Sequence, residues 1–143
     1  MYMGEFSHSL DSKGRMTIPA KFRNSLGERF VVTRSLDNCL CIYDMKSWEA
    51  FSEQLQSLAY SVKDQRTFTR FFFSGAAEVE PDKMGRILLP ASLRAAAKIE
   101  KDVVLVGAGS RIEIWSKDVW EEALSSDEMS DIAEAMAEKG IMI

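Results

Sequence analysis

The feature that most constrains the fold of this chain is an internal repeat. Shifted by 71 positions, residues 4–23 align with residues 75–94, and seven of the 20 aligned positions are identical. The match keeps its order over about 45 residues per copy, which indicates one duplicated unit of about 50 residues rather than a solenoid. The identical pairs are Gly4/Gly75, Asp11/Asp82, Gly14/Gly85, Arg15/Arg86, Pro19/Pro90, Ala20/Ala91 and Arg23/Arg94, and a shift of 72 adds Trp48/Trp120.

Both copies predict the same local structure. Residues 11–14 and 82–85 have the chemistry of turns, because an Asp side chain caps backbone amides and Gly accepts a positive φ. The strands on either side of each turn are expected to pair as a hairpin. A short helix then starts at a proline, and two more strands follow. The expected strands are 5–10, 15–18, 30–33 and 40–43 in the first copy, and 76–80, 86–89, 103–106 and 111–115 in the second.

The repeat also predicts the overall architecture. Four short strands and one small helix cannot bury both faces of a sheet within ~50 residues. Two copies can pair their strands into a closed barrel that leaves few open edges. We therefore expect an α+β, β-rich fold, namely a duplicated β-barrel with pseudo-two-fold symmetry and peripheral helices. The expected division is a first domain at 4–47, linking helices at 48–74, a second domain at 75–118 and an acidic C-terminal helix or tail at 119–143, with its last helix at about 127–138.

The charge distribution keeps a nucleic-acid partner open although the net charge is −4. Residues 118–138 hold eight acids and no base, whereas residues 1–117 hold 17 bases and 14 acids. Within residues 11–34 there are six bases and two acids. The local sign of charge governs the steering of a charged partner better than the total does. The alternative is an acidic, solvated tail on a neutral body.

Composition and motifs exclude several classes of function. No stretch approaches the ~18 to 20 apolar residues of a membrane span, and the N-terminal residues lack a secretory signal, so we expect a cytoplasmic protein. Cys39, Cys41 and a single histidine are too few for a closed zinc site, and we expect neither a metal nor a cofactor. The sequence contains no G-x-S-x-G motif and no phosphate-binding loop, so we expect neither an enzyme nor a small-molecule substrate.

The twice-used motif D-x-x-G-R carries the functional prediction. Arginine presents a rigid fork of donors that matches phosphate oxygens or the edge of guanine, and a rigid turn limits the entropy lost on binding. The alternative is that Arg15 pairs with Asp11 as a structural contact alone. Lys21, Arg23 and Arg94 are second-tier candidates for DNA contact, because a helix just behind a hairpin more often uses such residues as a solvated face. The candidate DNA contacts are Arg15, Arg86, Lys13 and Lys83, and the residues that shape the turns are Asp11, Gly14, Asp82 and Gly85.

At these residues the chain resembles the MraZ family of bacterial transcription regulators, which have two tandem SpoVT-AbrB domains. The resemblance covers residues 1–120 approximately and includes the family's twice-used D-x-x-x-R motif, which Asp11/Arg15 and Asp82/Arg86 match. It implies an AbrB-like swapped-hairpin β-barrel, a ring-shaped homo-oligomer, and binding to short direct repeats upstream of the division and cell-wall gene cluster. The segments that carry the resemblance are 4–6, 10–15, 18–23, 70–76, 82–86 and 111–115.

These observations predict a sequence-specific, nucleoid-associated regulator that binds double-stranded DNA, with repression by promoter blocking as the simpler mode. One subunit would bind weakly at cellular salt, and a ring on spaced repeats would multiply the affinity. The first alternative is a structural or protein-interaction ring without direct DNA readout. Salt separates the two, because DNA binding weakens steeply as salt rises and an apolar protein interface does not. The second alternative, a barrel enzyme, lacks a nucleophile–base pair.

Overall fold

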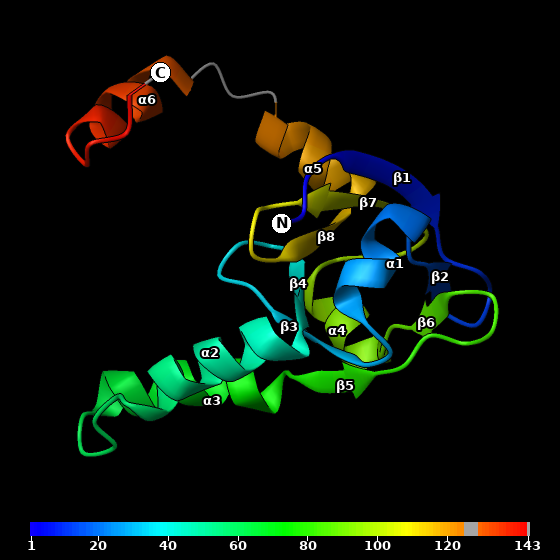
Figure 1. The fold of residues 1–143 in the computed structure, drawn as a ribbon, viewed down its shortest axis with the longest axis horizontal. Helices are drawn as coiled ribbons and strands as arrows, with labels where there is room; N and C mark the ends of the chain where they lie inside the picture. The colour runs from blue at the N-terminus through cyan, green and yellow to red at the C-terminus, as the bar shows by residue number, and fades with distance from the viewer. Residues whose placement is uncertain (125–128, 143) are drawn as a thin grey trace.

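The same order of elements occurs twice along the chain (Figure 1). The computed structural model describes residues 1–124 and 129–142, in which the chain forms eight strands and six helices. The first copy comprises β1 (Glu5–Ser9), β2 (Arg15–Thr17), α1 (Ala20–Leu26), β3 (Phe30–Arg34) and β4 (Leu40–Asp44). Helices α2 (Met45–Gln56) and α3 (Lys63–Ser74) follow. The second copy comprises β5 (Ala77–Val79), β6 (Arg86–Leu88), α4 (Ala91–Ala96), β7 (Asp102–Gly107) and β8 (Ile112–Ser116), followed by α5 (Lys117–Leu124) and α6 (Met129–Ala137).

The strands form two sheets that reflect the duplication. The larger sheet is antiparallel with the order β1-β7-β8-β4-β3-β5, and β2 and β6 form a separate two-stranded ribbon. Exchanging the two copies converts the six-strand order into its own reverse, so a pseudo-two-fold axis passes between β4 and β8. The expectation of an α+β fold is confirmed, and an antiparallel sheet dominates it.

The expected pairing of the two strands that flank each turn is wrong. β1 pairs with β7 and β2 pairs with β6, so both arms of the first turn join strands of the second copy. In the same way, β5 pairs with β3 of the first copy. The physical reason is burial. In this pairing Met16 lies opposite Ile87, and each side chain is only 1% exposed, above a core that both copies share.

That core contains side chains from both sheets and from the two short helices. Phe22 of α1 makes edge-on contacts with the rings of Tyr2 and Phe6, at centroid distances of 5.7 and 5.1 Å. Leu93 of α4 and Ala97 just after it are buried in the same cluster. Because a single cluster spans both copies, neither copy has a complete core of its own.

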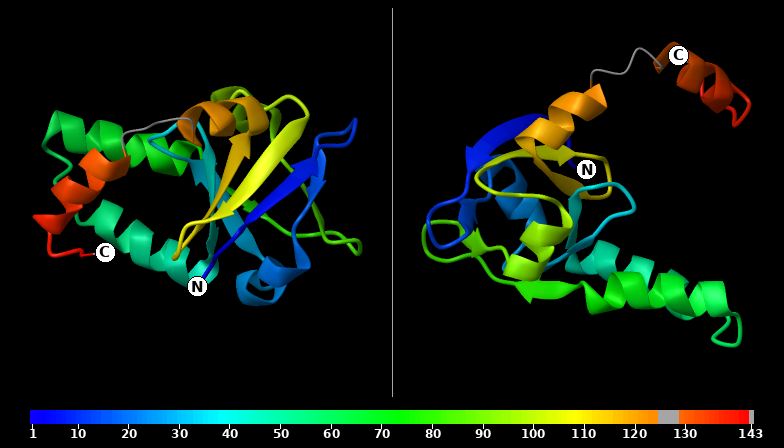
Figure 2. Two further views of the ribbon diagram at one scale, coloured as in Figure 1. Left: turned by 90° about the horizontal axis from the view of Figure 1, so that it is seen from above. Right: turned by 180° about the vertical axis from the view of Figure 1, so that it is seen from behind.

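Helices α2 and α3 lie side by side and project from the body on the side opposite the two turns (Figure 1; Figure 2). Asp44 caps α2, because its carboxylate accepts a hydrogen bond of 2.8 Å from the Ser47 amide. The aromatic residues of α3 pack against those of α2, with ring centroids 5.1 Å apart between Phe51 and Phe72. The aromatic cluster therefore forms the contact between the two helices.

The acidic C-terminal region contains helices α5 and α6. The predicted last helix at about 127–138 corresponds to α6, while residues 127 and 128 lie outside the described residues. Neither helix contains a buried residue. Nowhere in the described part of the chain is a helix both long and apolar enough to cross a membrane.

Candidate nucleic-acid interface

The first candidate turn is organised by the side chain of Asp11. Its Oδ1 atom accepts hydrogen bonds of 2.9 Å from the backbone amides of Lys13 and Arg15, and its Oδ2 atom accepts one of 2.7 Å from Arg15 Nε. The Gly14 amide donates to the Asp11 carbonyl at 3.0 Å, and Gly14 has a φ of +83°, which glycine adopts without strain. The spacing D-x-x-G-R therefore encodes a turn that closes on its own aspartate.

The second turn repeats this geometry. Asp82 accepts bonds of 2.9 Å from the amides of Met84 and Arg86 and one of 2.8 Å from Arg86 Nε. Each of these distances agrees with its counterpart in the first turn to within 0.1 Å. Gly85, with a φ of +77°, occupies the place of Gly14. Duplication has therefore preserved the hydrogen-bond pattern of the turn as well as its sequence.

Both aspartates are held ionised. Hydrogen bonding lowers the pKa of Asp11 from 3.8 to about 2, with the Arg15 backbone amide as the largest cause and its side chain and the Lys13 amide as further ones. The pKa of Asp82 is lowered for the same reasons, by the Arg86 amide first. Each aspartate therefore carries a full negative charge at neutral pH, which orients the guanidinium group next to it.

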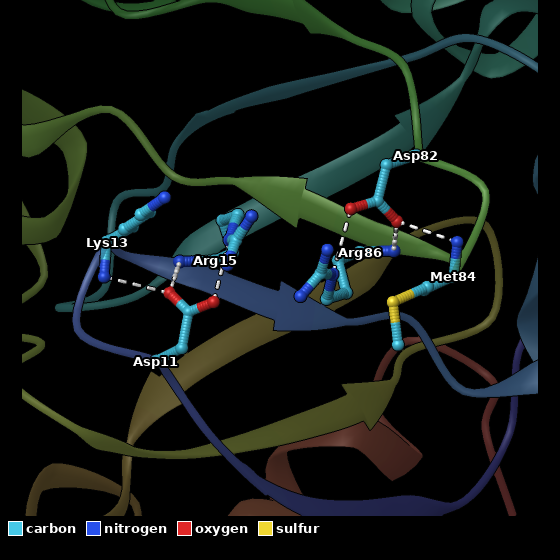
Figure 3. A network of polar contacts seen from close by, with 6 residues as sticks. All are labelled: Asp11, Lys13, Arg15, Asp82, Met84 and Arg86. Atoms are coloured by element: carbon cyan, nitrogen blue, oxygen red, sulfur yellow. Dashed lines mark hydrogen bonds and ion pairs between the residues drawn. The ribbon is translucent and has the colours of Figure 1, made fainter.

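The two arginines share the outward face of the β2–β6 ribbon (Figure 3). In the register of this ribbon Arg15 lies opposite Leu88, and Thr17 lies opposite Arg86. Arg15 and Arg86 are therefore diagonal neighbours, for which the typical separation is roughly 7–8 Å. Their side chains are 31% and 27% exposed, whereas Met16 and Ile87 fill the inward face. The ribbon thus presents a pair of guanidinium groups on one surface.

The pairing of each arginine with its aspartate leaves part of the guanidinium group available. The ion pairs use Nε, and within residues 1–124 and 129–142 neither Arg15 nor Arg86 has a hydrogen-bond partner for its Nη atoms. The structural contact and the binding role are therefore compatible, because the aspartate fixes the plane of a fork whose terminal donors remain free. Such a fork fits two oxygens of a phosphate or the O6/N7 edge of guanine.

The lysines of the two turns are both exposed but occupy different places. Lys13 has Met84 as its counterpart, while Lys83 corresponds to Ser12. With Arg15 and Arg86 they provide four positive charges against the two aspartates, a local excess of two. A local excess of positive charge of this kind suits a polyanion, although the chain as a whole is acidic. In the described part of the chain, no three metal-ligating side chains lie together.

Sequence reasoning missed the place of Arg23 and Arg94. The expected solvated helix face is wrong for these two residues, since both are half-buried behind the ribbon, although it holds for Lys21, which is exposed. Arg23 donates to the Ile18 carbonyl from Nε at 3.2 Å and from Nη2 at 3.1 Å, and Arg94 Nε donates to the Leu89 carbonyl at 3.1 Å. The identity of both arginines between the copies was a signal that could have indicated a structural role.

A comparison with protein families identifies the chain as a whole. The model described as "MraZ protein, putative antitoxin-like" matches residues 1–71 and again residues 72–140. This chain belongs to the MraZ family. The two matches cover nearly the whole chain and meet within the last turn of α3, a few residues before the second copy begins at β5.

Individual MraZ relatives match over almost their full length. The chain is 55% identical over 136 residues to a transcriptional regulator MraZ of Caldanaerobacter subterraneus, which covers 94% of this chain and 95% of the relative. It is 52% identical to that of Thermoanaerobacter pseudethanolicus, with 99% of this chain and 100% of the relative covered. It is 50% identical to that of Acetivibrio thermocellus, with 100% and 99% covered. All three relatives carry the name "Transcriptional regulator MraZ".

Proposed function

We propose that this protein is a sequence-specific, DNA-binding transcriptional regulator whose contact surface is the outward face of the β2–β6 ribbon. Arg15 and Arg86 contact the DNA directly, and Lys13 and Lys83 contact neighbouring phosphates. Asp11, Gly14, Asp82 and Gly85 shape the turns. The observation that carries the proposal is the presence of two hydrogen-bonded turns that orient two guanidinium groups on one exposed surface. The name of the relatives as transcriptional regulators supports it.

The fold proposal is the AbrB-like swapped-hairpin β-barrel, with domains at 4–47 and 75–118, linking helices at 48–74 and the acidic tail at 119–143. Support comes from the exchange of strands between the copies, in which β1 pairs with β7 and β5 pairs with β3. The chain would assemble into a ring in the cytoplasm and associate with the nucleoid. Repetition of the ribbon around a ring supplies the multivalency that a small contact surface requires.

The proposed site of action is a set of short direct repeats upstream of the division and cell-wall gene cluster, where the bound ring blocks the promoter. The test is a titration of the full-length protein against the DNA upstream of its own gene by fluorescence anisotropy. Arg15→Ala and Arg86→Ala should each weaken binding by about 1–3 kcal/mol per engaged subunit, or roughly 5- to 150-fold, if the arginines contact bases.

Arg70→Ala is the matched control. It removes the same charge from an exposed position on α3, a helix that projects away from the ribbon (Figure 1), and alanine favours a helix. This variant should bind as the unaltered protein does. Binding by the two ribbon variants at the level of the control, together with little salt dependence, would instead support the alternative of a protein-interaction ring without DNA readout.

A further inference from the structure

The turn glycines are buried although the turns around them are exposed. The cover comes from the opposite copy in each case. A Cβ atom at Gly85 would lie 2.5 Å from Cζ of Arg23, and a Cβ atom at Gly14 would lie 3.0 Å from Cζ of Arg94. The guanidinium group of each helix arginine thus packs against the turn of the other copy at the position where a side chain has no room.

Hydrogen bonds hold each of these guanidinium groups in place. Arg23 donates twice to the carbonyl of Ile18, and the amide of Ile18 donates to the carbonyl of Gly85 at 2.9 Å. A continuous path of bonds therefore leads from the first copy to the second turn, one residue before Arg86.

The equivalent path of hydrogen bonds leads from the second copy to the first turn. Arg94 donates to the carbonyl of Leu89, and the Leu89 amide donates to the carbonyl of Gly14 at 3.0 Å, one residue before Arg15. The two paths are related by the pseudo-two-fold axis of the ribbon, so each repeat supports the turn that the other repeat presents.

We infer that Arg23 and Arg94 are positioning residues that act crosswise, so that Arg23 fixes the turn of Arg86 and Arg94 fixes the turn of Arg15. The support of each turn by the arginine of the other copy is a property of the free protein. Its effect on DNA affinity rests on the proposed function. Each turn needs a contact from its buried side, because the hydrogen bonds that Asp11 and Asp82 accept lie at an exposed surface, where water competes for them. The planar fork of arginine fills this role and a lysine ammonium does not.

The first experiment measures amide hydrogen exchange by NMR in the full-length protein. In Arg23→Lys the amides of Met84 and Arg86 should exchange roughly three- to tenfold faster, because their acceptor Asp82 lies on the loosened turn. The amides of Lys13 and Arg15 should keep their rates. Arg94→Lys should give the reciprocal result, so that each variant is the control for the other.

A second pair of variants removes any contribution of the ammonium group. Arg23→Met and Arg94→Met keep an apolar stem and have no donor, and they should reproduce the crossed pattern. Faster exchange in the turn of the substituted copy, equal change in both turns, or no change in either would each overturn the inference.

The second experiment measures DNA affinity in a double-mutant cycle. The loss of DNA affinity caused by Arg23→Lys should disappear in an Arg86→Ala background, because Arg23 acts through Arg86. In an Arg15→Ala background the same fold loss should remain, in addition to the loss that Arg15→Ala causes. Equal losses in both backgrounds would overturn the crossed role in binding. If Arg86→Ala itself leaves DNA binding unchanged while the exchange pattern is crossed, the proposed function fails and the crossed support of the free protein stands.

Discussion

The two turns of the ribbon share a backbone and differ in the side chains around it. Both turns bond Asp to Arg and to two backbone amides in the same way. On the outward face, however, Lys13 and Thr17 of the first copy correspond to Met84 and Leu88 of the second, which are 66% and 56% exposed. The pseudo-symmetry therefore applies to the orientation of the arginines and stops at the residues that flank them.

This difference indicates a division of labour between the halves of the surface. An exposed lysine beside Arg15 suits a phosphate, which accepts a hydrogen bond from an ammonium group. Met84 holds the matching position in the second turn and cannot bind phosphate, although Lys83 beside it can. Apolar side chains at a DNA surface, here Met84 and also Leu88 opposite Arg15, contact the methyl group of thymine. Under the proposed function, we therefore expect Lys13 to contribute to the salt dependence of binding and Met84, at the matching position, to contribute to base preference instead.

The largest expected effect tests the backbone that the turns share. Gly14→Ala and Gly85→Ala should each lower the free energy of unfolding by about 1–2 kcal/mol, since alanine is strained at a positive φ. Gly85→Ala should cost more, because its Cβ would lie closer to the bonded guanidinium of Arg23 than the Gly14 Cβ would lie to Arg94. Urea denaturation gives both values. Gly27→Ala is the control for backbone strain without a contact, because Gly27 also has a positive φ and, among the described residues other than its neighbours, no atom lies within 4 Å of its Cβ position.

A smaller effect tests the difference in charge. Met84→Lys adds a lysine to the second turn at the position that matches Lys13 and should strengthen DNA binding at low salt. It should also steepen the plot of log affinity against log salt by about 0.9 for each phosphate newly engaged. Lys13→Met should do the reverse. Titrations at several salt concentrations check both, and parallel lines for all three proteins would contradict the division of labour.

The smallest effect is the response of the turns to acid. Because the pKa of Asp11 is lowered to about 2, its ionised form stabilises the folded state above pH 3.8. This contribution should disappear as the pH falls from 3.8 to about 2, and Asp82, whose pKa is also lowered, should behave in the same direction. NMR titration of the two carboxyl groups measures this. A pKa near 3.8 in the folded protein would show that the turn bonds do not persist in solution, and Asp11→Asn should remove the Asp11 component alone.

Local features of the fold could be predicted from the sequence. The turn at Asp11–Arg15, the cap at Asp44 and the helix end at Gly27 depend on hydrogen bonds between residues within five positions of each other. Such bonds depend on residue type and spacing, both of which a sequence displays. The candidate arginines were found in the same way, because the motif that orients them is only five residues long.

The pairing of strands could not be predicted in this way. β1 and β2 are close in sequence and were expected to pair with each other, yet each pairs with a strand that lies about 70 or more residues further along the chain. Their alternation of apolar residues is equally compatible with both arrangements. The same holds for Arg23, whose contact with Gly85 crosses 62 positions of sequence.

The duplicated order of elements and the internal geometry of each Asp–Arg turn follow from residue type and spacing, because both arise from contacts between near neighbours. The completion of each turn by the opposite copy and the placement of both arginines on one face follow from long-range packing. That outcome follows from burial: the apolar sides of β2 and β6 reach a continuous core only when the two copies exchange strands, and this exchange brings each helix arginine beneath the other copy's glycine.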